Sequence, residues 1–190
     1  MRKTRKKKKN KEIFILLIFL LLVTGILVKV VYEEPSIERI FTGTHEDFYE
    51  ELAPLARDIG KKYDLFPSVI LAQAALESGY GKSQLTREYN NYFGIKATTS
   101  SSVRLPTTEV EQGKTVHIDG DFETYPSVKA SFKGYGKLVG TVSRYEKVRQ
   151  ANSPEEAAQA LYDCGYSTSP KYPKMVMRII EKDELRKYDE

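Results

Sequence analysis

The first constraint on this chain is an apolar run of 19 residues, Ile13 to Val31, interrupted by one charge at Lys29. As a helix, a run of this length crosses the roughly 30 Å hydrocarbon core of a bilayer. Lys29 lies near the far end, where its ammonium can extend to the interface. Eight Lys or Arg residues precede the run within residues 2–11, and such clusters stay on the cytoplasmic side. We therefore expect a single-pass anchor in the cell membrane, with the remainder of the chain outside the cell.

The alternative for this run is a cleaved signal peptide. A signal peptide usually has a shorter apolar region followed by a small-x-small cleavage site, and the exit from Val30 to Pro35 contains no such site. The run is not followed by a Cys, which argues against a lipoprotein. The expected division is a basic cytoplasmic tail at 1–12, a transmembrane signal anchor at 13–31, a linker at 32–43 and one external domain at 44–190.

The net charge of +4 comes from the tail. Residues 1–12 carry eight positive charges and one negative, +7 in all, which leaves −3 for the rest of the chain. A slightly acidic external domain argues against nucleic-acid binding, which favours a basic face. Cys164 is the one cysteine, which excludes an intramolecular disulfide, and with only two His it argues against a zinc site. We expect neither a metal nor an organic cofactor.

Apolar residues at steps of three and four predict a helix that begins at Thr44, with Asp47 at the capping-box spacing. Pro54 falls inside this stripe and predicts a kink or a break. A second helix is expected from Ser68 to about Ser78. It is apolar on nearly all sides, so we expect it to be the buried central helix. Later helices are expected after Ser127, at Ser153 and near Ser169.

Between these helices the pattern predicts short strands. They are expected at Val103–Glu111, Lys114–Ile118 and Asp121–Tyr125, with turns at Gln112-Gly113 and Asp119-Gly120. With the helices, they predict an α+β domain that is mainly helical and carries a small antiparallel β-hairpin sheet.

Glu77 lies at the end of the apolar second helix. Burial disfavours the anion and raises the pKa of a carboxyl group, and the negative end of the helix dipole acts in the same direction. Both effects favour a carboxylic acid that keeps its proton near neutral pH, as a general acid requires. On the pattern alone, the alternative is a solvated Glu in the last turn of a helix, which is the commoner case.

Two neighbouring segments, Leu71–Ser83 (LAQAALESGYGKS) and Asn90–Lys96 (NNYFGIK), closely resemble glycoside hydrolase family 73. Members of this family are bacterial endo-β-N-acetylglucosaminidases of the cell wall with a lysozyme-like fold. The resemblance covers about residues 44–187 and implies that Glu77 is the catalytic acid. Typical members have Trp where this chain has Tyr80, so the resemblance implies that Tyr80 stacks on a sugar ring.

Glycoside hydrolysis commonly uses two carboxylates, and the resemblance places the second in a hairpin with the pattern Thr-x-Glu-x-x-x-Gly-Lys. The segment Thr107–Lys114 matches this pattern and assigns the role to Glu109. Glu111 competes with it, because alternate residues of a strand point to the same face. With a two-residue turn, Glu111 pairs with Lys114 and Glu109 with Val116, so only Glu111 has a charged cross-strand partner. We favour Glu109; the alternative for both residues is a solvated, charged hairpin.

The resemblance implies further site residues. Tyr172 matches a tyrosine near the catalytic glutamate, although the family's Asp-Pro-x-Tyr-Ala reads Ser-Pro-Lys-Tyr-Pro here. Asn91, Phe93 and Gly94 match the wall of the substrate cleft, with an amide for sugar groups, an apolar floor and a glycine that allows close approach. Tyr125 matches a tyrosine expected near the substrate. Core packing is the alternative for Tyr172 and for Phe93.

The sequence therefore predicts a monomeric, membrane-anchored hydrolase of peptidoglycan glycan strands, whose specificity for the β-1,4 bond after N-acetylglucosamine rests on the resemblance alone. Two alternatives stay open. A lytic transglycosylase shares the fold and the Glu-Ser-Gly helix end but uses one glutamate, and Glu109 argues against it. An inactive wall-binding module would not need Glu77, and the chain retains that residue.

Overall fold

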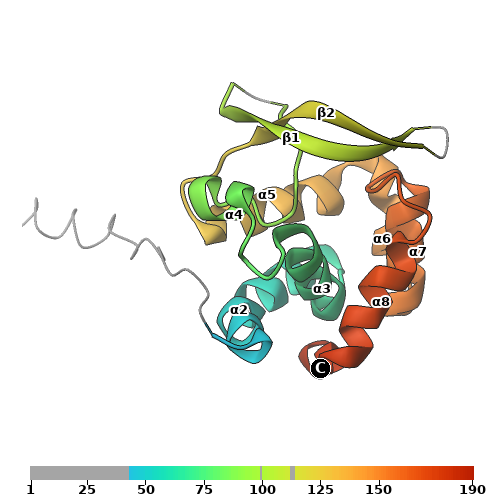
Figure 1. The fold of residues 1–190 in the computed structure, drawn as a ribbon. Coiled ribbons are helices and arrows are strands. Elements are labelled where there is room, and N and C mark those ends of the chain that lie inside the picture. The colour runs from blue at the N-terminus through green and yellow to red at the C-terminus, as the bar shows by residue number, and fades with distance from the viewer. Residues whose placement is uncertain (1–42, 99, 112–113) are drawn as a thin grey trace, which may run out of the picture. The chain divides into compact units, whose positions relative to one another are not determined.

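The computed structural model describes residues 43–98, 100–111 and 114–190, without the side chains of residues 108–115. The expected tail, the expected anchor and nearly all of the expected linker lie outside these residues. Within this part of the chain, no helix combines the length and the apolar character needed to span a membrane. Figure 1 shows a body of helices with a hairpin of two strands lying across one side.

The helix α2 (His45–Tyr63) begins as the sequence predicts. Thr44 accepts a hydrogen bond from the Asp47 N–H through its hydroxyl oxygen, and its own N–H donates to the Asp47 carboxylate, which completes a capping box. A break at Pro54 does not occur, because α2 continues through this residue. Proline removes one backbone donor, and the helix is held by an inner face that includes the buried residues Phe48 and Leu52.

The helix α3 (Pro67–Ser78) is the buried central helix that the sequence predicts, since all eight residues from Ser68 to Ala75 are buried. Pro67 occupies its first turn, where no backbone donor is needed. Gly79 ends the helix in the left-handed conformation with φ +57°. Because α3 packs on all sides, the core fixes the position of its C-terminal end, which carries Glu77.

Several of the other helices pack against α3, which Figure 1 shows near the centre of the helical body. Ser127 and Ser153 each cap a helix by accepting a backbone N–H, as expected. The last long helix begins at Tyr172 rather than near Ser169. The bounds are α4 (Gln84–Tyr89), α5 (Val128–Thr141), η1 (Ser143–Tyr145), α6 (Glu146–Arg149), α7 (Pro154–Asp163), α8 (Tyr172–Lys182) and η2 (Leu185–Tyr188).

The sheet consists of two antiparallel strands, β1 (Ser102–Glu111) and β2 (Lys114–Glu123). The turn expected at Asp119-Gly120 is wrong, because β2 runs through both residues and Gly120 pairs with Leu105. A Cβ at Gly120 would lie 3.2 Å from side-chain atoms of Phe122 and Thr107, a tight contact inside the hairpin. The second and third expected strands are therefore one strand.

The register of the hairpin agrees with the prediction. Glu111 pairs with Lys114, and Glu109 pairs with Val116. Residues 109 and 111 alternate with residue 110, so both belong to the same face of β1. Among the described residues, the expected fold class, mainly helical with a small antiparallel sheet, is confirmed.

Candidate active site

Glu77 is the penultimate residue of α3 and is half-buried where the helix ends. The chain turns sharply after it, because Gly79, Tyr80 and Gly81 all have positive φ, at +57°, +57° and +77°. Ser78 holds this turn: its hydroxyl donates to the Ala74 carbonyl and accepts from the Gly81 N–H at 2.7 Å. The turn thus leaves the Glu77 side chain at the end of a rigid element, which suits a group that must be held in one position.

A buried chain of hydrogen bonds reaches Glu77 from the core. Tyr135 donates its hydroxyl hydrogen to Gln73 Oε1 at 2.5 Å, and Gln73 Nε2 donates to the Tyr172 hydroxyl oxygen at 2.8 Å. Tyr172 is in turn hydrogen-bonded to Glu77. The exposed fractions of Gln73, Tyr135 and Tyr172 are 0%, 1% and 3%. The structure thus brings Tyr172 together with Glu77, whereas a part for Tyr172 in catalysis stays a prediction.

Two tyrosines that interact with the Glu77 charge, Tyr172 and Tyr166, have strongly raised hydroxyl pKa values. Burial raises the pKa of the Tyr172 hydroxyl well above its ordinary value, and the Glu77 charge acts in the same direction. Burial also raises the pKa of Tyr166 well above its ordinary value, with further contributions from Tyr172 and Glu77. Both hydroxyls therefore keep their protons at neutral pH and can act as hydrogen-bond donors, Tyr166 to the Phe93 carbonyl and Tyr172 to Glu77.

The segment after α4 borders Glu77. Gly94 has φ +62°, which favours glycine, and a Cβ at this position would lie 3.4 Å from Glu77 Oε2, at van der Waals distance. Close approach of a substrate at Gly94 stays a prediction. Phe93 is only 1% exposed and stacks on Tyr135 with 4.3 Å between ring centroids, so its side chain belongs to the core. Contact between Phe93 and a substrate stays a prediction. Tyr166 donates its hydroxyl hydrogen to the Phe93 carbonyl at 2.9 Å and fixes this segment.

The side chain of Asn91 holds the same segment through hydrogen bonds to backbone groups. Its Nδ2 donates to the carbonyls of Ile95 at 3.0 Å and Glu123 at 2.9 Å, and its Oδ1 accepts from the N–H groups of Phe93 at 3.3 Å and Ile95 at 3.1 Å. The side chain is 1% exposed. Its amide is therefore occupied by backbone groups that it ties to β2, and direct contact with a sugar stays a prediction.

Tyr80 faces the start of α2 and the end of α8. Its ring stacks on His45 with 3.5 Å between centroids, and its hydroxyl donates to Asp183 Oδ2 at 3.1 Å. Tyr49 donates to the same oxygen at 2.7 Å. His45 covers one face of the Tyr80 ring, so the structure gives Tyr80 a packing role, and its stacking on a sugar stays a prediction.

Tyr125 connects the end of the hairpin to the helices. Its N–H donates to the Tyr89 carbonyl at 2.9 Å, and its carbonyl accepts from Asn90 Nδ2 at 3.1 Å. Its ring lies over α5, where a Cβ at Gly134 would be 2.6 Å from the hydroxyl oxygen. Burial, with a smaller effect of the Glu123 charge, raises the pKa of Tyr125 to about 12. Its contact with substrate stays a prediction.

The side chains of Glu109 and Glu111 lie outside the described part of the hairpin, which gives only their backbone pairing. The backbone of Glu109 lies opposite the uncharged Val116, and that of Glu111 opposite Lys114, as the choice of Glu109 as second carboxylate requires. The sequence reasoning did not single out Glu123, which is 8% exposed. Glu123 Oε1 accepts from the Thr98 N–H at 2.7 Å and the Thr98 hydroxyl at 2.9 Å, which joins β2 to the preceding loop.

Sequence reasoning also missed Gln73, Tyr135 and Tyr166. Gln73 had a signal: it is a polar residue in an apolar helix, four residues before Glu77 and thus on the same helical face. Neither tyrosine had one. Across the described residues, no group of three His, Cys, Asp or Glu side chains is placed to hold a metal ion. The arrangement provides a carboxyl group that can give up a proton and a buried phenol that can stabilise the resulting anion.

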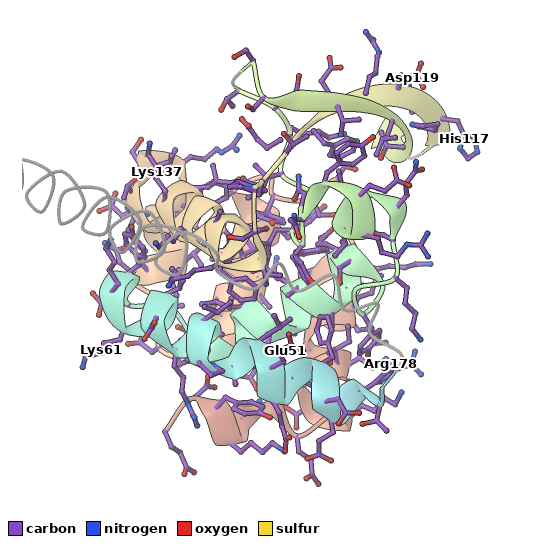
Figure 2. The ribbon with its side chains drawn as sticks, turned by 90° about the vertical axis from the view of Figure 1, so that its left-hand side faces the viewer. Glu51, Lys61, His117, Asp119, Lys137 and Arg178 are labelled. Atoms are coloured by element: carbon purple, nitrogen blue, oxygen red, sulfur yellow. The ribbon has the colours of Figure 1, made fainter. Side chains whose placement is uncertain are left out.

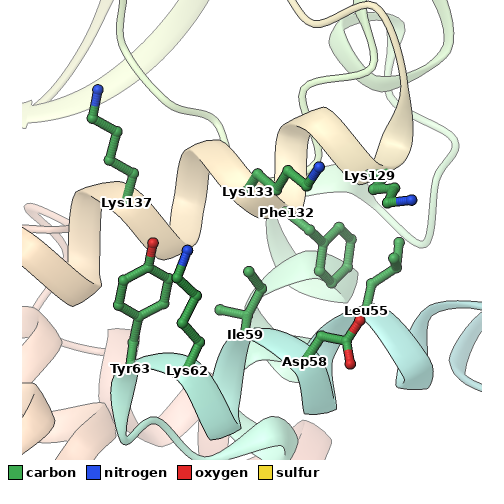
Figure 3. Close-up of a pocket in the computed structure, with 9 residues that line it drawn as sticks. All are labelled: Leu55, Asp58, Ile59, Lys62, Tyr63, Lys129, Phe132, Lys133 and Lys137. Atoms are coloured by element: carbon green, nitrogen blue, oxygen red, sulfur yellow. The ribbon is translucent and has the colours of Figure 1, made fainter.

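A hollow of about 350 Å³ lies between α2 and α5, away from these groups. In Figure 3 its apolar floor is formed by Leu55, Ile59 and Phe132, and lysines from both helices surround it. Figure 2 marks this side of the helical body with Lys61 and Lys137, and the hairpin with His117 and Asp119. The hollow is not lined by any of the predicted site residues, so the structure does not connect it with chemistry at Glu77.

Comparison with known proteins agrees with this fold. A family model for glucosaminidases, described as mannosyl-glycoprotein endo-beta-N-acetylglucosaminidase, matches residues 53–185. The exo-glucosaminidase LytG of Bacillus subtilis (strain 168) is 34% identical in an alignment of 197 positions, gaps included, that covers 98% of this chain and 70% of LytG. A probable N-acetylmuramidase of Lactococcus lactis subsp. lactis is 37% identical over 156 residues, which cover 78% of this chain and 36% of that protein.

Among solved structures, the catalytic domain of the autolysin Auto from Listeria monocytogenes superposes with a TM-score of 0.66. It is 34% identical, and the match covers 78% of this chain and 89% of that domain. The similarity therefore extends over nearly the whole of a solved catalytic domain, whereas this chain spans about a third of the Lactococcus relative.

Proposed function

The chain belongs to the glucosaminidase family and is a peptidoglycan hydrolase, and we propose that it cleaves the β-1,4 bond on the reducing side of N-acetylglucosamine within wall glycan strands. The choice of bond is a proposal because the names of the two relatives differ, one a glucosaminidase and the other a muramidase. The family description favours the bond after N-acetylglucosamine and cleavage inside the strand.

In this proposal Glu77 is the general acid. It protonates the leaving oxygen as the bond from the anomeric carbon lengthens, and an oxocarbenium-like transition state develops on the sugar. Glu109 supplies the second carboxylate, which activates the attacking water or stabilises the positive charge. Tyr172 donates to the Glu77 carboxylate as it forms, and charge-assisted hydrogen bonds of this kind are the stronger ones.

The setting of Glu77 is the observation that carries the proposal. Its half-buried carboxyl ends the central helix, receives a hydrogen bond from a buried tyrosine and lies beside Gly94. A solvated glutamate at a helix end would not need a buried tyrosine as its hydrogen-bond partner. The same helix end carries the sequence motif on which the resemblance rests.

We also propose that the enzyme acts from the cell membrane, anchored through residues 13–31 with its catalytic domain facing the wall. Support comes from the basic tail before the apolar run and from the lack of a small-x-small site after it. A linker of 12 residues, 32–43, reaches at most about 40 Å when extended. The domain would therefore meet glycan strands close to the membrane.

Mass spectrometry of digestion products tests the reaction. The full chain in neutral detergent is incubated with purified peptidoglycan, and the new ends are identified after borohydride reduction. The proposal predicts oligosaccharides with N-acetylglucosamine at the reducing end and one added water per cleavage. Reducing-end N-acetylmuramic acid would contradict the choice of bond, and anhydro ends without water would indicate the transglycosylase. Free N-acetylglucosamine as the main product would indicate cleavage from chain ends, and binding without products would indicate a wall-binding module.

A further inference from the structure

We propose that Gln73 and Tyr135 are positioning residues that fix the direction of the hydrogen bond between Tyr172 and Glu77, without touching the reacting atoms themselves. The inference rests on the proposed role of Glu77 as general acid. Its basis is the buried chain Tyr135–Gln73–Tyr172–Glu77, in which the first two hydrogen bonds measure 2.5 and 2.8 Å. Its residues Tyr135, Gln73 and Tyr172 come from α5, α3 and α8, three helices of the helical body in Figure 1.

The direction of donation follows from what each atom can do. Gln73 Oε1 can only accept, and it accepts from the Tyr135 hydroxyl. This contact orients the amide, so that Nε2, which can only donate, faces the Tyr172 oxygen. Tyr172 therefore keeps its own hydrogen for another acceptor, and Glu77 is that acceptor.

The reverse orientation of the amide would have the opposite effect. With Oε1 facing Tyr172, the Tyr172 hydrogen would be donated to Gln73, and Glu77 would lose its donor. The Tyr135 hydroxyl favours the observed orientation. In the reverse orientation it could accept from Nε2, but its own buried hydrogen would lose the acceptor that Oε1 provides. Gln73 is 0% exposed, so bulk water does not reach its amide to replace a lost partner.

The direction matters for an acid. A donor on one oxygen of Glu77 stabilises the carboxylate that forms when the proton leaves. Because this oxygen of Glu77 accepts from the donor, the proton of the acid form resides on the other oxygen. A hydrogen bond to the charged form lowers the pKa of the carboxyl group, so this chain opposes the effect of burial and sets the pH at which the acid form is lost.

The test is the pH dependence of kcat/KM for the full chain carrying Tyr135→Phe. Activity needs protonated Glu77, so the basic limb reports the pKa of Glu77 in the free enzyme. In the variant the Gln73 amide is free to turn, and the carboxylate loses its donor. The pKa of Glu77 then rises and the basic limb moves to higher pH, while the plateau falls by roughly 3- to 30-fold.

Tyr49→Phe is the matched control. Tyr49 is also a buried tyrosine, 2% exposed, and its hydroxyl donates to a carboxylate oxygen, that of Asp183, at 2.7 Å. Its loss is expected to lower the melting temperature without moving the basic limb. The pH of the basic limb does not depend on the amount of folded protein in the sample. A partly unfolded Tyr135→Phe sample therefore still shows whether the pKa of Glu77 has shifted.

A double variant separates positioning from an independent effect. Tyr172→Phe alone is expected to move the limb upward, and adding Tyr135→Phe should move it no further, because Tyr135 acts through Tyr172. An unmoved limb in Tyr135→Phe, or an equal extra shift on top of Tyr172→Phe, would overturn the inference. After either of these results, Glu77→Gln in the same assay shows how far the failure extends. If that variant is inactive, only the inference fails; if it is active, the proposed function fails as well.

Discussion

Gly94 and Gly165 have the same backbone conformation in different surroundings. Their φ values are +62° and +75°, both in the left-handed region. A Cβ at Gly94 would lie 3.4 Å from Glu77 Oε2, whereas a Cβ at Gly165 would meet no atom within 4 Å. The two positions therefore separate the cost of backbone strain from the effect of a methyl group beside the carboxyl group.

Gly94→Ala is expected to lower both stability and activity, and Gly165→Ala mainly stability. Each substitution places an alanine in the left-handed region, which costs roughly 1–2 kcal/mol. Only Gly94→Ala places a methyl group against the proposed acid, and small displacements of a catalytic group lower rates by on the order of tenfold or more. Melting curves and kcat/KM for both variants check this. Equal activities would show that the space beside Glu77 is not used by substrate.

The hairpin shows what sequence reasoning achieves for an element and where it stops. The strand register was predictable because a turn of a given length fixes which residues of the two strands pair. The structure has the predicted pairing, with Glu111 opposite Lys114. The turn at Asp119-Gly120 was predicted wrongly because the dipeptide is typical of turns. Gly120 instead pairs with Leu105 inside the strand, and the dipeptide alone does not distinguish a turn from a paired strand.

The register predicts different effects for the two hairpin glutamates. Glu109→Gln should lower activity by ~10²–10⁴ with little change in stability, because a general base or charge stabiliser contributes that much. Glu111→Gln should stay active, and the loss of its pairing with Lys114 should cost only ~0.2–1 kcal/mol.

Turnover of defined glycan fragments, with melting curves alongside, compares the variants. An inactive Glu111→Gln with an active Glu109→Gln would reverse the assignment. Full activity in both would argue against a two-carboxylate mechanism and favour the transglycosylase with a single glutamate.

At the level of the whole molecule, the sequence predicted the central helix and the position of Glu77 at its end, because a local apolar pattern and a local motif carry both. The family resemblance placed Tyr172 near Glu77, but nothing in the sequence pointed to Tyr135 or Tyr166. Tyr135 and Tyr172 are 62 and 99 residues from Gln73, and Tyr166 is 73 residues from Phe93. Such contacts form only when α5 and α8 fold back onto α3, so no periodicity or spacing in the sequence predicts them.

The proposed anchor predicts that the full chain stays in the membrane with its C-terminal end outside. Protease added to intact, wall-stripped cells should degrade the domain and leave the basic tail protected. The intact N-terminal segment should be found by mass spectrometry in the membrane fraction. A main species in the culture fluid that begins after Val31 would show that the segment is a cleaved signal peptide instead.

The most direct test of the central claim is the rate of peptidoglycan digestion by Glu77→Gln. Glutamine keeps the size of the side chain and an oxygen that can accept from Tyr172, but its amide is not an acid. The account predicts a loss of at least about 10²-fold, the usual contribution of a general acid, with a melting temperature close to that of the wild type. A purified, folded Glu77→Gln protein that digests peptidoglycan at nearly the wild-type rate would contradict it.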